Sequence, residues 1–284
     1  MTEQSPKTDV RELPVIATIL LGYREAVRYL PFYVAASIGW AAALGLVQLP
    51  LDQLLERRQG VGAAGTAALM QAQQYLTLAV GLFGAAVLSV MASRAVLLAQ
   101  SPAWLDGLRI GRRQLRIVGL GLLFYVAIYV EVFAIFHVGF LALPERAASA
   151  AREMLFGQDR RLGLYLLWIL WSFLQSLTLT PFFGLAFPLA SIDAGTSLLR
   201  RSARISSDYR WRIAAISIIG HLPFLLINAV PYLAWHGSFG TTVGVHVVAG
   251  FVSLLGIAVS AATLAVMLDH VAGRLRQQMY DIFD

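Results

Sequence analysis

Ionisable side chains within apolar segments are the residues of this chain best placed to do chemistry. Glu131 is the only carboxylate well inside a predicted membrane span; His137 follows it on the same segment, and His246 begins the last segment. Burying such groups costs about 2.5–3.5 kcal/mol each at the centre of a membrane helix, so their presence points to function. Together they would suit an outward-facing site for a proton, a cation or a metal ion.

A structural role is the alternative for these three residues. Glu131 and His137 are separated by a spacing that is neither i+3 nor i+4, so they share a helix face poorly. In the alternative, the glutamate hydrogen-bonds to a polar neighbour and the histidines lie at headgroup level. The expected neighbours are Tyr125, Tyr129 and Gln175.

A second polar group lies near the middle of the fifth apolar segment, where Pro223 and Asn228 follow His221. Helices interrupted by proline frame ligand sites in transporters by exposing backbone groups. Polar side chains in spans also join helices through hydrogen bonds worth about 0.6 kcal/mol each. These residues give one functional hypothesis, a small secondary transporter or channel with a polar site near Glu131 and His221.

Arginine carries nearly all of the positive charge, since Lys7 is the only lysine among 22 basic residues. The arginines lie in short connectors beside apolar segments. This placement favours contact with anionic lipid headgroups over nucleic-acid binding, and generic anchoring of the topology is the alternative. We predict a basic collar composed of Arg109, Arg112, Arg113, Arg200, Arg201 and Arg204.

The elements that position these residues are membrane helices. Of the 284 residues, 58% are hydrophobic and 13% are charged, against about 25% charged in soluble domains. We therefore predict an all-α polytopic protein, with residues 1–284 forming a single membrane domain, because no connector is long enough for a soluble core. Segments of about 20 apolar residues suffice to cross a bilayer. Six qualify: Leu30–Leu49, Tyr75–Val96, Ile117–Leu141, Leu162–Leu189, Ile213–Leu233 and Val243–Leu268.

The distribution of basic residues predicts the orientation. Most of them fall on one side of the six predicted spans, which places both termini in the cytoplasm and the protein in a bacterial inner membrane. The stretch before the first span lacks the features of a signal peptide, so we expect that span to be retained. In the fourth segment, Pro181 and Pro188 are the expected points of a bend.

Three cytoplasmic stretches predict short amphipathic helices in the membrane interface: Pro14–Tyr29, Ser101–Arg116 and Asp193–Tyr209. Each precedes a pair of spans. This order predicts a three-fold repeat with units 14–99, 100–192 and 193–276. The alternative is that arginines precede outward spans in any protein that obeys the positive-inside rule.

A block of motifs gives a family resemblance. It consists of Leu185–Pro188, Asp193–Gly195, Leu198–Ser202 and Trp211–Ile213. The block resembles the six-span membrane domain attached to some bacterial glycerophosphodiester phosphodiesterases, and the stand-alone inner-membrane relatives of that domain. In the fused proteins the catalysis belongs to a separate soluble barrel. No segment of this chain would form that barrel, so the resemblance implies a membrane role without the phosphodiesterase activity.

No motif for a catalytic centre is evident, and the chain has no cysteine. We therefore predict a non-enzymatic protein that uses no cofactor and no metal. The expected partners are membrane lipids with anionic headgroups and other membrane proteins, and nucleic acid is not expected. The leading functional hypothesis is a lipid-associated or partner-organising protein of envelope or phospholipid metabolism.

Overall fold

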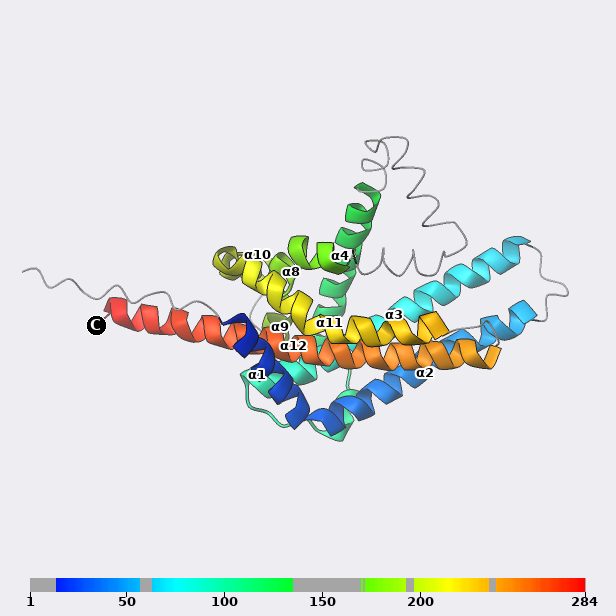
Figure 1. Ribbon diagram of the computed structural model, residues 1–284, viewed down its shortest axis with the longest axis horizontal. Helices are drawn as coiled ribbons and strands as arrows, with labels where there is room; N and C mark the ends of the chain where they lie inside the picture. The colour runs from blue at the N-terminus through cyan, green and yellow to red at the C-terminus, as the bar shows by residue number, and fades with distance from the viewer. Residues whose placement is uncertain are drawn as a thin grey trace, which may run out of the picture.

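The computed structural model describes residues 14–56, 63–134, 170, 172–192, 197–234 and 239–283, and its regular elements in these ranges are all helical (Figure 1). The prediction of an all-α protein is confirmed for this part of the chain. The α-helices are α1 (Val15–Arg28), α2 (Leu30–Glu56), α3 (Ala63–Leu97), α4 (Arg112–Ala134), α8 (Thr180–Phe183), α9 (Ala186–Ser191), α10 (Leu198–Ser206), α11 (Arg210–Ala234) and α12 (Phe239–Phe283). Two short 3-10 helices are η1 (Trp104–Gly107) and η3 (Ser207–Tyr209).

Five of the described helical segments are long and apolar enough to cross a membrane. They lie in α2, α3, α4, the α10–α11 region and α12, and the count rises to 6 if one bent pair of helices forms a single span. The protein is therefore a multi-pass membrane protein. Helix α12 lies at the centre, since α1, α2, α3 and α11 all pack against it, while α4 crosses this group at a steep angle (Figure 1).

The bend expected in the fourth apolar segment is present. Helix Ser172–Thr178 meets Thr180–Ser191 at 51°. Pro181 lies immediately after this junction and has no amide hydrogen to bond the carbonyl of Leu177, so the regular helix ends there. The helix is interrupted a second time at Gly184 and Leu185, between α8 and α9. Pro188 lies one turn later and has no amide hydrogen to bond the carbonyl of Gly184.

The predicted interfacial helices differ in outcome. Helices α1 and α10 form in the first and third stretches. The prediction of a single helix over Ser101–Arg116 is wrong. That stretch contains only η1 before α4 begins. Its backbone is fixed by a tertiary contact, because the indole nitrogen of Trp40 donates to the carbonyl of Gly107 at 3.0 Å. Asp106 also accepts a hydrogen bond from the backbone amide of Ala103 at 2.9 Å, which closes a tight turn.

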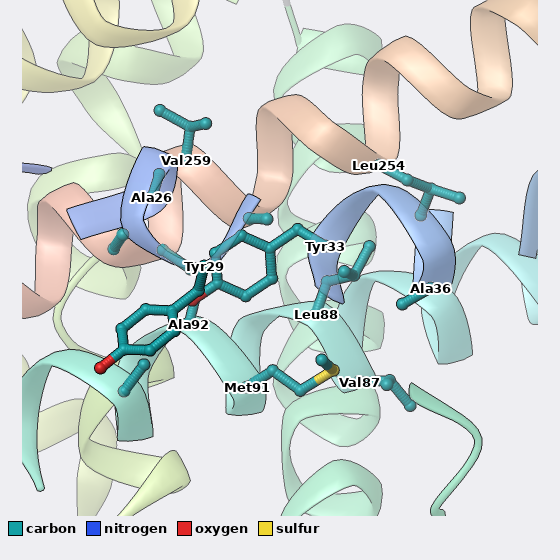
Figure 2. Close-up of a cluster of buried hydrophobic side chains, with 14 of the residues drawn as sticks. Ala26, Tyr29, Tyr33, Ala36, Val87, Leu88, Met91, Ala92, Leu254 and Val259 are labelled. Atoms are coloured by element: carbon teal, nitrogen blue, oxygen red, sulfur yellow. The ribbon is translucent and has the colours of Figure 1, made fainter. Parts of the chain in front are cut away.

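Two clusters of buried apolar side chains hold the helices together. One joins α1, α3, α4, α9, α10, α11 and α12, and the other joins α1, α2, α3, α11 and α12. Figure 2 shows the second cluster, in which Tyr29 and Tyr33 lie on the side of α3 that carries Leu88, Met91 and Ala92, with Val259 on the α12 side. Dispersion contacts of this kind drive helix association in lipid, where the hydrophobic effect between helices is absent.

Candidate functional site

Glu131 lies at the end of the apolar stretch of α4 and faces the bent helix pair. Its Oε1 accepts a hydrogen bond from the hydroxyl of Thr178 at 2.6 Å. Its Oε2 is buried and has no hydrogen-bond partner among the described residues. A buried oxygen without a partner is uncommon in native structures and calls for an explanation.

The hydroxyl of Thr178 has a second acceptor within reach, the backbone carbonyl of Leu174 at 2.9 Å. A hydroxyl carries one proton, so Thr178 can donate to Glu131 or to Leu174 but makes only one full hydrogen bond at a time. Thr178 is thus the partner of Glu131 in place of the expected Tyr125, Tyr129 or Gln175. It lies one turn after Gln175 on the bent segment.

The other two residues of the predicted outward-facing site lie outside what the structure describes. His137 lies outside the described residues, and His246 belongs to α12 but its side chain is outside them as well. Within the ranges that the structure describes, no group of three or more histidine, aspartate or glutamate side chains is positioned to hold a metal ion.

A polar seam joins α11 to α12. We use this name for His221, Phe224 and Asn228 on α11 with Ser253, Gly256 and Ser260 on α12. His221 Nδ1 lies 3.1 Å from the hydroxyl of Ser260, and the Asn228 amide nitrogen donates to the hydroxyl of Ser253 at 2.8 Å. Both sets follow an i, i+3, i+7 spacing, so they align face to face between antiparallel helices.

Glycine permits the close packing at the middle of this seam. A Cβ atom on Gly256 would lie 2.9 Å from Cγ of Phe224, closer than ordinary van der Waals contact. Asn228 is 5% exposed, and its Oδ1 has no partner in the described residues. The seam therefore fits the structural alternative for His221 and Asn228, in which hydrogen bonds join neighbouring spans.

The structure does not unite Glu131 with His221 and Asn228. Glu131 contacts the helix before the bend, whereas the other two residues contact α12. Helix α4 packs against α3 and α9, while α11 packs against α12, α1 and α8. A single polar path through all three residues is thus not formed by any one helix interface in the described part of the chain.

The six arginines of the basic collar are all described. Arg109 in the α3–α4 connector and Arg112 at the start of α4 are exposed, and Arg113 is half-buried. On α10 the arginines at 200, 201 and 204 are exposed, while Leu198 and Ser202 are buried on the opposite face. The hydroxyl of Ser202 donates to the carbonyl of Phe182 at 2.7 Å and ties α10 to α8. The predicted two-faced character of α10 is confirmed.

Large apolar side chains are exposed beside these arginines. In the α3–α4 connector, residues 98–111, Trp104 is 62% exposed, Leu105 79% and Leu108 71%. Trp211, which follows α10, is 77% exposed. The connector is nevertheless held in place, because the ring of Trp104 packs on that of Phe32 with centroids 4.6 Å apart. A fixed loop with outward apolar side chains and arginines is typical of a segment that lies in a membrane interface.

Sequence reasoning missed Thr178 and Ser253 as partners of the intramembrane polar residues. For Ser253 a signal existed, because serine, glycine and serine at positions 253, 256 and 260 mark one face of α12. For Thr178 none existed, since its contact with Glu131 depends on a bend whose direction the sequence does not specify. Comparison with known proteins adds no further assignment: no protein-family model, curated protein or solved structure matches this chain.

Proposed function

We propose that this chain is a non-enzymatic protein of the bacterial inner membrane whose basic collar binds anionic lipid headgroups at the cytoplasmic face. The observation that carries the proposal is the α3–α4 connector. Trp104, Leu105 and Leu108 are exposed there although the loop is anchored, and arginines flank them. Exposed apolar area costs about 25 cal/mol per Å² in water, a cost that the bilayer interface removes.

The same proposal includes a topology. The bent helix pair counts as one span, which gives six spans, and both termini are cytoplasmic, because the collar arginines then follow the positive-inside rule. The three units 14–99, 100–192 and 193–276 are copies of one helix-plus-two-spans element, with η1 replacing the interfacial helix in the second copy. The family resemblance suggests phospholipid or envelope metabolism as the setting, with other membrane proteins as further partners.

Titration of the detergent-purified protein with phosphatidylglycerol tests the collar. Each arginine near an anionic surface contributes about 1 kcal/mol, so R200Q/R201Q/R204Q should weaken binding by up to about 100-fold at low salt. High salt should weaken wild-type binding in the same direction. The matched control is R57Q/R58Q, which removes arginines from a connector that we predict to be on the outer side.

Two results would reject the collar. One is unchanged phosphatidylglycerol binding after all six collar arginines are replaced by glutamine in a protein that keeps its helical content. The other is equal affinity for zwitterionic phosphatidylcholine. Fluorescent-protein and alkaline-phosphatase fusions to the C-terminus test the topology separately, because the first is active only in the cytoplasm and the second only outside it.

A further inference from the structure

The ionised and the protonated forms of Glu131 make different hydrogen bonds with Thr178. When the carboxylate is ionised, Thr178 donates to Oε1, while Oε2 shares the negative charge and is buried without a hydrogen-bond partner in the described part of the chain. A carboxylate with only one oxygen hydrogen-bonded is costly where lipid, and not water, covers it. In that state the carbonyl of Leu174 also loses the hydroxyl that lies 2.9 Å from it.

When Glu131 is protonated on Oε1, a continuous chain of hydrogen bonds forms and the oxygen without a partner no longer carries charge. The acid O–H donates to the oxygen of Thr178, the Thr178 hydroxyl donates to the carbonyl of Leu174, and Oε2 is left as a neutral carbonyl oxygen. The short O···O distance of 2.6 Å suits a carboxylic acid donor or a carboxylate acceptor equally. The geometry therefore accommodates both states of one proton.

We propose that Glu131 and Thr178 form a reversible proton-binding site within the membrane. A proton from the aqueous phase at the nearer end of α4 forms one new O–H bond on Oε1. No covalent bond breaks: the Thr178 hydroxyl keeps its own proton and rotates about its C–O bond from Glu131 to Leu174. This site is separate from the collar arginines at positions 109, 112 and 113, which lie at the other end of α4.

On the described elements packed around the site, Glu131 carries the only carboxyl group, and histidine is absent from them. Helix Ser172–Thr178, α8 and α9 carry no ionisable side chain. Helix α3 carries Tyr75 and Arg94, and α4 itself carries Tyr125 and Tyr129 besides the arginines of its first turns.

The proton is coupled to the helix bend through Thr178. A threonine hydroxyl that bonds the carbonyl one turn earlier tends to bend a helix, and Thr178 lies directly before the 51° junction at Pro181. Proton uptake strengthens this backbone hydrogen bond, and proton release withdraws it. The state of Glu131 thus biases the geometry of the bent span.

Infrared difference spectroscopy of the full-length protein in lipid nanodiscs tests the site across a pH titration. Wild-type protein should show the C=O band of a buried protonated carboxylic acid, and Glu131→Gln should abolish it, which isolates one carboxyl group among 16 acidic residues. Thr178→Val should shift the band, and Thr178→Ser should restore its position. The control is Glu25→Gln, since Glu25 instead pairs with Arg28 on α1 at 3.7 Å and should leave the band unchanged.

Three outcomes would overturn the proposal. Spectra of wild type and Glu131→Gln that coincide at every pH would show that Glu131 takes up no proton in this range. A band that is insensitive to Thr178→Val would remove the hydroxyl from the site. A band that responds to sodium in place of choline at fixed pH would identify a metal-cation site instead. If Glu131→Gln fails to fold, the infrared band is measured in Thr178→Val and Glu131→Asp instead.

Discussion

Replacing Gly22 by alanine should separate α1 from α12 and destabilise the membrane domain. An added Cβ at Gly22 would lie 2.2 Å from the hydroxyl oxygen of Thr263 and 2.6 Å from its Cα, whereas ordinary contact begins at 3.4 Å. Because the obstacle includes backbone, rotation of a side chain cannot relieve the clash. The helices must move apart by about 1 Å, and overpacking of this kind costs about 1–3 kcal/mol.

A matched control distinguishes this clash from the general effect of alanine in a helix. Gly39 lies within α2 with nothing within 4 Å of its added Cβ. Because alanine is favoured over glycine in helices by about 1 kcal/mol, Gly39→Ala should be neutral or stabilising. The free energy of unfolding is measured for both variants by titration with sodium dodecyl sulfate in mixed micelles. Equal stability of Gly22→Ala and Gly39→Ala would refute the predicted close packing of α1.

Two further predictions concern hydrogen bonds between helices. In the polar seam, a double-mutant cycle of Asn228→Ala and Ser253→Ala should give a coupling energy of about 0.6 kcal/mol in the same unfolding assay, and zero coupling would contradict the contact. Burial raises the pKa of the Tyr23 phenol above its ordinary value of 10.0, and this hydroxyl donates to the carbonyl of Gly220 at 2.7 Å. Since the unfolded phenol loses its proton first, stability should be constant below about pH 10 and fall as the pH rises toward the folded pKa. Tyr23→Phe should abolish this alkaline loss, and identical pH profiles for the two proteins would contradict the assignment.

The membrane class and the positions of most helices followed from composition and from the lengths of the apolar segments. The bend before Pro181 was also predictable, because proline removes a backbone donor wherever it occurs. The failure at Ser101–Arg116 has a different origin. Its helical pattern is real, but Trp40 and Ala36, more than 60 residues away, contact Gly107 and fix the loop. Local periodicity carries no information about such a contact.

The candidate site shows the same limit of prediction from a single sequence. The sequence identified Glu131 as an exceptional residue because a carboxylate in an apolar segment is recognisable from composition alone. Its partner is a threonine, a residue common in membrane helices, and the contact joins positions 47 residues apart. An ionisable residue in a span can therefore be found in a single sequence, but the neutral groups that determine its protonation require the packing of the helices.

Helix α1 illustrates a signal that was present in the sequence but had two interpretations. Its amphipathic pattern predicted a helix lying in the membrane interface. Thr18, Gly22 and Ala26 recur every four residues, however, and all three are buried, so this stripe of small residues packs α1 against α12. Ile16 and Leu20 remain exposed on another face, where lipid would cover them. The two patterns are compatible, because a helix that contacts both protein and lipid needs small residues on one face and large apolar residues on the other. Helix α1 is therefore part of the packed membrane domain, and the Gly22→Ala substitution tests that assignment directly.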